Sequence, residues 1–137
     1  MEGKNLLLKK TKTFIISTID KEGYPITKAV VKPKIIESQK ELYFATNTSS
    51  NFVQAIKENK KASVYFYKRG IIKWQGVLLQ GTMQIIEDLT VKEKYWNNLY
   101  KSAYETKKFT DPDFCLLKFT AEKGREYRNF KVSDIDL

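Results

Sequence analysis

The chain contains no histidine among its 137 residues, and this absence excludes a wide range of chemistry. Histidine is the commonest general base and the commonest metal ligand among protein side chains. Without it, no Ser-His or Cys-His pair can form a catalytic nucleophile. If the protein is an enzyme, we therefore expect a bound cofactor to supply the reactivity.

Cysteine and long apolar runs are also scarce. The one cysteine, Cys115, has no partner for an intramolecular disulfide and cannot build a cysteine metal cluster. It lies in the apolar run FCLLKF, which favours a buried structural thiol. No apolar run is long enough to span a membrane, and the run at residues 6–8 is too short for a signal peptide. We therefore expect a cytoplasmic protein with no membrane span and no metal site.

Positive charge and aromatic side chains, in contrast, are abundant. Lysine and arginine number 25 against 16 acidic residues, which gives a formal net charge of +9, and there are eight Tyr, eight Phe and two Trp. Such a charge favours anionic partners such as a phosphorylated small molecule or nucleic acid. The lysines are spread along the whole chain, however, which is equally typical of a solvated surface. The length predicts one domain, residues 1–137, with a real core.

The most informative stretch is residues 42–59, LYFATNTSSNFVQAIKEN. It begins as an apolar strand, passes through the polar junction TNTSSN at residues 46–51, and resumes with Phe52, Val53 and Ile56 at helical spacing. The free N–H groups and the dipole of a helix's first turn attract anions, so we interpret the junction as a candidate phosphate site. An ordinary capped helix is the alternative, because the same residue types are favoured at any N-cap.

The rest of the chain reads mainly as strands. Gly76 and Gly81 interrupt a long strand and predict the bulges or bends that curl a sheet into a barrel. Thr90 and Glu93 have the spacing of a capping box. The pattern predicts a mainly β, α+β fold, a small antiparallel barrel of about six strands with two or three helices. We expect strands at 13–20, 24–36, 42–46, 61–68, 71–87, 114–120 and 125–132, and helices at 2–10, 49–59 and from 90 to about 105.

Four stretches carry a resemblance to a known family. They are GYPITKAV at residues 23–30, LYFATNTSSN at 42–51, ASVYF at 62–66 and WQGVLLQG at 74–81. In this order and spacing the chain resembles the pyridoxamine 5'-phosphate oxidase-like superfamily of FMN-binding split β-barrels, and within it the general stress protein branch. The resemblance implies a split barrel, FMN as the cofactor, a homodimer with FMN at the subunit interface, and oxidoreductase chemistry on a small molecule.

The resemblance also implies particular roles for residues of the site. Lys28 takes the place of a basic residue, often Arg, that faces the FMN phosphate. Asn51 stands where Lys or Arg is usual, and Lys57 is a weaker substitute. Gln75 resembles the glutamine that reaches the flavin ring from the partner subunit, with Trp74 as its neighbour. The full set of cofactor-binding residues implied is Lys28, Ala29, Val30, Thr46, Asn47, Ser49, Ser50, Asn51, Trp74 and Gln75.

Ordinary structural roles are open for the same residues. Lys28 on a strand fits a solvated charge, and Trp74 fits a core or interface aromatic. Tyr65 and Tyr67 alternate on one strand face, where core or dimer packing explains them.

Several functions are left open by the residues. Oxidation of pyridoxamine phosphate itself is disfavoured, because the tail GREYRNFKVSDIDL lacks the histidine of the true oxidases. A non-catalytic flavin-binding stress protein is one alternative, and a basic β-barrel for single-stranded nucleic acid is a second, less favoured one. The remaining alternatives are haem or a deazaflavin in the place of FMN, or the same fold with no cofactor. Haem is disfavoured because Cys115 is the only thiolate available for ligation.

Overall fold

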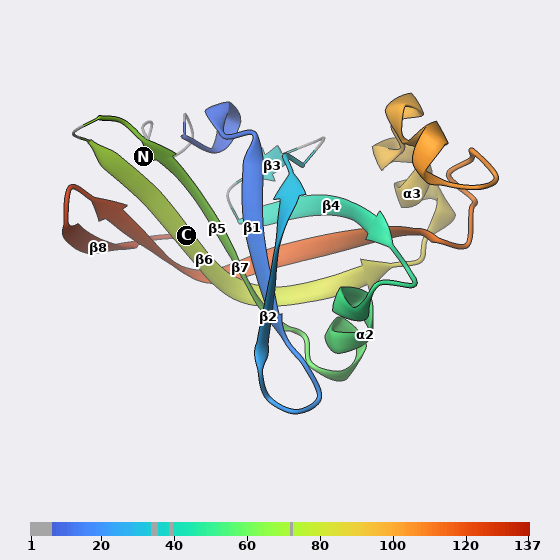
Figure 1. Cartoon of the computed structure of the whole chain (residues 1–137), viewed down its shortest axis with the longest axis horizontal. Coiled ribbons are helices and arrows are strands. Elements are labelled where there is room, and N and C mark those ends of the chain that lie inside the picture. The colour runs from blue at the N-terminus through green and yellow to red at the C-terminus, as the bar shows by residue number, and fades with distance from the viewer. Residues whose placement is uncertain (1–6, 34–35, 39, 72) are drawn as a thin grey trace.

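Eight strands in the described part of the chain pair into one antiparallel sheet (Figure 1). The computed structural model describes residues 7–33, 36–38, 40–71 and 73–137. Along the sheet the strand order is β2-β1-β5-β6-β7-β4-β3, and β8 pairs with β7 beside this path. The strands are β1 (Thr13–Ile19), β2 (Pro25–Val31), β3 (Ile36–Ser38), β4 (Glu41–Asn47), β5 (Lys61–Arg69), β6 (Trp74–Ile86), β7 (Phe114–Arg128) and β8 (Lys131–Ile135).

The sheet curls without closing. Among the described residues β2 pairs only with β1 and β3 pairs only with β4, so the two ends of the sheet leave an open seam. In Figure 1 β4 lies on the side of β2 that faces away from β1. This arrangement confirms the predicted antiparallel split barrel of an α+β protein, although the described sheet has eight strands where about six were expected.

The curl depends on a bend in the two longest strands, β6 and β7. Their register shifts between Gln80 and Gly81. A Cβ atom on Gly81 would lie 1.9 Å from the carbonyl oxygen of Thr120, so only glycine allows β7 to approach this closely. Before the bend β6 also pairs with β5, and beyond it β7 also pairs with β4. The bend expected at Gly81 is confirmed. Gly76 lies in regular register and instead makes room for the ring of Tyr65.

The core fills the inside of this curled sheet. The ring of Phe14 contacts those of Phe66 and Phe44 there, with centroid distances of 5.1 Å and 6.3 Å, respectively. Helix α2 (Asn51–Glu58) covers one end of the core with its apolar face, which includes the fully buried Val53. The predicted helical spacing at residues 52–56 is thereby confirmed.

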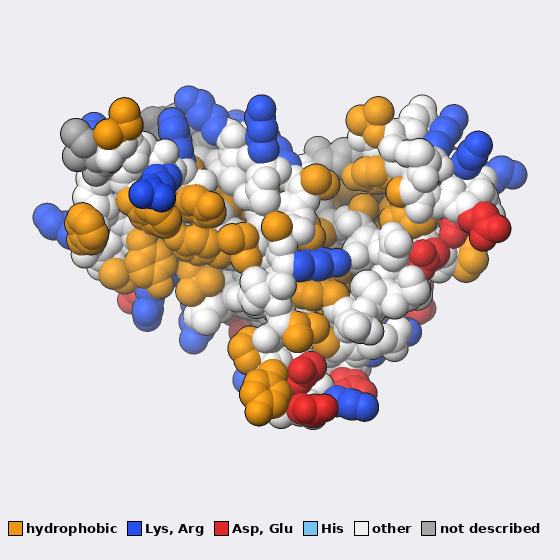
Figure 2. Space-filling view, in the orientation of Figure 1, with side chains coloured by type: hydrophobic (Ala, Val, Ile, Leu, Met, Phe, Trp, Pro, Cys, Tyr) orange, Lys and Arg blue, Asp and Glu red, His pale blue; other side chains and the backbone are white. Residues whose placement is uncertain are grey.

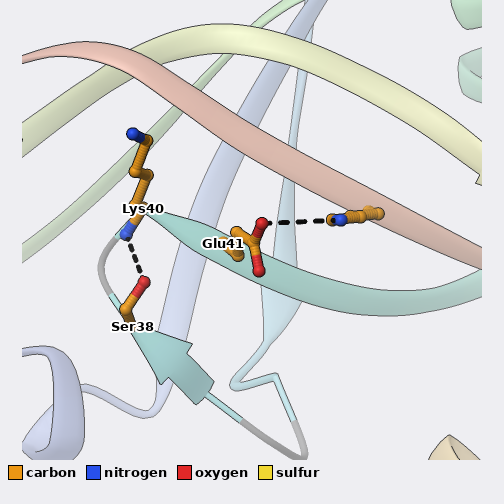
Figure 3. A network of polar contacts seen from close by, with 4 residues as sticks. Ser38, Lys40 and Glu41 are labelled. Carbon is orange, nitrogen blue, oxygen red and sulfur yellow. Dashed lines mark hydrogen bonds and ion pairs between the residues drawn. The ribbon is translucent and has the colours of Figure 1, made fainter.

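The turn between β3 and β4 forms one border of the seam. The backbone N–H of Lys40 donates to Ser38 Oγ at 3.1 Å, and the carboxylate of Glu41 lies 3.5 Å from the ammonium of Lys118 on β7 (Figure 3). Both contacts are exposed or half-buried. They fix this edge of the sheet.

Several predicted boundaries were wrong. Helix α3 (Leu89–Tyr95) begins one residue before the predicted start, because Asp88 caps it and Thr90 does not. It ends before Trp96, and a separate 3-10 helix, η1 (Asn98–Ala103), follows where one long helix was expected. The segment 114–128 is one strand, and the chain then turns through Asn129 and Phe130 at positive φ into β8.

Other predicted boundaries are less far off. The second predicted strand divides into β2 and β3, and β6 begins at Trp74 where residue 71 was expected. Of the helix predicted at residues 2–10, residues 7–10 are helical and the others lie outside the described residues. Across the described ranges, no helix has the length and apolar character needed to cross a bilayer.

We expect Gly81→Ala to destabilise the protein by about 2 kcal/mol or more, because the added methyl group overlaps the backbone of β7. Gly124→Ala is the matched control on β7, since the atoms nearest to its Cβ would be side-chain atoms, the flexible end of Leu79 at 3.1 Å and the side chain of Ile135. Urea unfolding measures both variants. Equal loss in the two would contradict the assignment of the bend to Gly81.

Candidate functional site

A lysine on the edge strand reaches across the seam. Lys28 lies in the middle of β2, and its Nζ donates to Thr46 Oγ1 on β4 at 3.1 Å. The same ammonium lies 5.0 Å from the centre of the Phe52 ring, in the first turn of α2. The structure therefore brings together three elements that sequence reasoning had connected only through one proposed ligand.

The charge of Lys28 is incompletely compensated. Its side chain is half-buried, and this burial lowers the pKa of the ammonium, an effect that the nearby Cys115 partly opposes. Within the described residues no carboxylate lies within ion-pair distance of it. A partly desolvated cation with one hydroxyl partner is suited to accept an anion from solution.

The N-terminus of α2 lies at the same place. Ser50 is its N-cap, and Ser50 Oγ accepts the N–H of Val53 at 3.2 Å, which confirms the ordinary capping role. The hydroxyl proton of Ser50 is still available for donation. The backbone N–H groups of Asn51 and Phe52 donate to no acceptor in the described part of the chain. Helix dipole and free donors thus add to the positive potential of Lys28.

The junction before this helix is fastened from outside the barrel. The N–H of Ser49 donates to Asp113 Oδ1 at 3.0 Å, and Thr48 donates from its N–H to the carbonyl of Asp113 and from its hydroxyl to that of Pro112. The N–H of Ser49 is therefore unavailable to a ligand. Sequence reasoning missed Asp113, because the Asp-Pro-Asp motif at residues 111–113 gives only a chain-breaking signal.

The thiol of Cys115 lies beside the site and is buried. Cys115 on β7 pairs with Thr46 on β4, and 4% of its surface is exposed. Burial raises the pKa of this thiol, so it is protonated at neutral pH. The expectation of a buried structural cysteine is confirmed.

The remaining residues predicted around this cluster differ in exposure. Ala29 is exposed on β2, and Val30 packs against the core. Asn47 ends β4, and its carbonyl accepts the N–H of Ser50 at 3.1 Å. Asn51 is exposed at the first position of α2. A neutral residue thus stands where the resemblance would place a cation.

Trp74 and Gln75 lie elsewhere in the chain. Both begin β6 at the β5–β6 turn, in the upper left of Figure 1, whereas α2 lies at the lower right. Because the register is regular here, Trp74 points to the outer face of the sheet and Gln75 to the inner face with Val77. The Gln75 amide nitrogen is buried and has no hydrogen-bond partner among the described residues. One chain does not bring these two residues to Lys28.

An aromatic surface surrounds Trp74. Its ring stacks on that of Tyr67, with centroids 5.3 Å apart and planes inclined by 7°, and the Arg69 guanidinium lies 5.9 Å from the same indole. Figure 2 shows hydrophobic side chains gathered over β5, β6 and β8. A groove of about 420 Å³ opens here. The groove is lined by Tyr65, Trp74, Leu78, Tyr127 and Phe130. We call these residues, together with Tyr67, the aromatic face.

Comparison with solved structures shows the same fold elsewhere. A protein of Clostridium acetobutylicum, related to general stress protein 26 of B. subtilis and assigned to the pyridoxinephosphate oxidase family, is 32% identical with a TM-score of 0.86, covering 99% of this chain and 93% of that one. General stress protein 26 of Bacillus anthracis is 22% identical, with a TM-score of 0.73 and coverages of 98% and 97%.

A more distant relative is described by its cofactor. A pyridoxamine 5'-phosphate oxidase-related, FMN binding protein of Nostoc punctiforme is 14% identical, with a TM-score of 0.71 and coverages of 99% and 96%. Among curated proteins none matches this chain. The family model described as pyridoxamine 5'-phosphate oxidase matches residues 4–128. Because this match spans nearly the whole sequence, the chain belongs to the pyridoxamine 5'-phosphate oxidase family.

Proposed function

We propose that this protein binds FMN at the seam between β2 and β4 and acts as an oxidoreductase on a small molecule. The observation that carries the proposal is the Lys28 ammonium, which reaches Thr46 beside the N-terminus of α2 without a carboxylate partner among the described residues. Family membership and the FMN binding relative of Nostoc punctiforme support the choice of cofactor.

The residues present fit a phosphate monoester. Lys28 supplies a point charge, Thr46 holds its ammonium in place, and Ser50 caps the helix while keeping one proton to donate. The free N–H groups at the start of α2 add two further donors. The neutral Asn51 removes one expected charge, so Lys28 would carry most of the Coulombic attraction for the phosphate.

The edge of β2 suits the flavin ring. Since β2 pairs only with β1 in the described sheet, every second residue has backbone N–H and C=O groups directed toward the seam. Ala29 and Val30 lie directly after Lys28 on this edge. Val30 uses its backbone groups to pair with Phe14 on β1, so those of Ala29 are the ones that would orient a planar ring whose phosphate is held by Lys28.

FMN, when bound, supplies hydride transfer, which protein side chains cannot provide by themselves. The protein's own part is to bind the phosphate, to align the ring along β2 and to exclude water. Specific oxidation of pyridoxamine phosphate stays disfavoured because the tail lacks histidine.

A second copy of the chain would complete the site. Trp74 and Gln75 lie too far along the sheet to join Lys28 within one chain, and the aromatic face exposes Trp74, Tyr67 and Phe130. Exposed aromatic patches of this kind mark interaction surfaces. We therefore propose a homodimer in which the aromatic face of one copy lies against the flavin of the other.

Lys28→Ala should weaken FMN binding by roughly 10- to 100-fold, because a charge-assisted contact to phosphate is lost. Fluorescence titration with FMN and with riboflavin separates the phosphate from the ring, and riboflavin binding should not change. Lys21→Ala, in the exposed β1–β2 turn, is the charge-matched control. Equal FMN affinity of wild type and Lys28→Ala would remove the proposed phosphate site.

Ser50→Ala should cost about 1 kcal/mol of stability through the lost cap and should also weaken FMN binding. Ser50→Asp separates the two effects. Aspartate is a good N-cap and preserves stability, but its charge repels phosphate, so FMN affinity should fall further than in Ser50→Ala. Thermal unfolding and FMN titration measure the pair. Unimpaired FMN binding by Ser50→Asp would place the phosphate elsewhere.

Trp74→Glu should dissociate the dimer and lower FMN affinity, because a charge replaces an aromatic anchor of the aromatic face. A rise of roughly 30-fold in the dimer dissociation constant is expected if Trp74 is a central contact. Sedimentation velocity reports the assembly. Leu99→Glu, on the exposed surface of η1, is the control. A wild-type protein that sediments as a monomer with FMN bound would contradict the shared site.

A further inference from the structure

The segment between η1 and β7 is hydrogen-bonded to the junction that precedes α2. In the described part of the chain, four hydrogen bonds join residues 104–113 to residues 46–49. They involve both main-chain and side-chain atoms. Yet none of the residues that supply them from this segment belongs to the set predicted to touch a cofactor.

Tyr104 makes the contact closest to Lys28. Its hydroxyl donates to the carbonyl oxygen of Thr46 at 2.8 Å, while the side chain of the same Thr46 accepts from Lys28. The ring is 6% exposed and packs edge-on against Phe114 and at an angle against Trp96. Burial, with a smaller contribution from Asp113, raises the pKa of Tyr104 to about 12. The hydroxyl is therefore a donor throughout the physiological pH range.

Asp111 fixes the conformation of residues 106–113 within this segment. Its Oδ2 accepts the hydroxyl of Thr106 at 2.6 Å and the N–H of Thr106 at 2.8 Å, and its Oδ1 accepts the N–H of Asp113 at 2.8 Å. These hydrogen bonds, led by that of the Thr106 hydroxyl, lower the pKa of the carboxyl. The charged carboxylate thus orients Asp113, which in turn holds Thr48 and Ser49.

We propose that Tyr104 and Asp111 are positioning residues that preorganise the anion site for the phosphate of FMN; this rests on the proposed function of that site. Neither side chain lies among the groups expected to touch the ligand. Tyr104 fixes the carbonyl of Thr46, and Asp111 fixes the loop that holds Thr48 and Ser49. Together they set the direction in which Thr46 presents its hydroxyl and in which α2 begins.

The physical reason is the short polar junction itself. Pairing between β4 and β7 ends at Asn47 and Phe114, so Thr48 and Ser49 have no strand partner and depend on residues 112–113. A phosphate site built from one lysine and two helical N–H groups gains affinity when its donors are already aligned before binding. Without these hydrogen bonds, part of the binding free energy of the ligand would be used to order residues 46–49.

The test compares Tyr104→Phe with Tyr100→Phe. Both substitutions remove one phenolic oxygen from the same aromatic cluster, but the Tyr100 hydroxyl donates to no described residue. Each variant and the wild type are titrated with FMN and with riboflavin, and amide hydrogen exchange is followed without ligand. Asp111→Asn is the second variant, because it replaces one acceptor oxygen of the carboxylate by a donor.

Tyr104→Phe should weaken FMN binding by roughly three- to tenfold, the range expected for one hydrogen bond. Riboflavin affinity should not change, and exchange should accelerate at residues 46–51. Asp111→Asn should give the same pattern, and Tyr100→Phe should behave as wild type. This combination supports the positioning role.

Two results would overturn the positioning role while leaving the proposed function intact. One is a wild type that prefers FMN to riboflavin together with a Tyr104→Phe variant that binds FMN unchanged. The other is an equal loss of both ligands in Tyr104→Phe, which indicates general damage to the fold. A wild type without preference for FMN over riboflavin would overturn the phosphate site and the positioning role together.

Discussion

The close approach of two backbones at Gly81 is the constraint from which the geometry of the site follows. With no Cβ at this position, β7 passes against β6 where a methyl group would meet the Thr120 carbonyl at 1.9 Å. The long strands bend there, and the sheet curls until its edge at β2 faces β4. The seam that results is narrow enough for one lysine side chain to cross from β2 to β4. A flat sheet of the same strands would leave Lys28 in solvent.

Crossing the seam places Lys28 in an unusual electrostatic position. Burial disfavours its charge, and the one described hydroxyl partner compensates only part of that cost. Proteins commonly keep such imperfectly satisfied groups where a ligand completes them. The same region contains free helical N–H groups and a polar junction held by a separate loop. The incompletely compensated charge and the free donors thus lie together where the ligand is proposed to bind.

Local patterns in the sequence predicted the strands around this site and the capped helix after it, because alternation and N-cap chemistry act over a few residues. They failed at two local boundaries, and they failed for residues whose role depends on groups distant in sequence. The Thr90–Glu93 spacing indicated Thr90 as the N-cap of α3, but Asp88 is the N-cap. The polar pair Glu122 and Lys123 lies inside one continuous strand, β7, where two strands were predicted. The resemblance supplied Lys28 and Thr46, but Tyr104 and Asp111 carry no local signal at all. Their role depends on contacts between residues that lie 58 and 64 positions apart in sequence.

The solitary thiol of Cys115 has a practical consequence. It is the only cysteine of the chain, it pairs with Thr46 across the β4–β7 ladder, and it is almost entirely buried. A thiol reagent can reach it only when this part of the ladder opens, and no other sulfhydryl competes for the reagent. The rate of its alkylation therefore measures how often the β4–β7 pairing opens locally beside the site. The molecule contains its own single-position probe of how firmly β4 is held to β7.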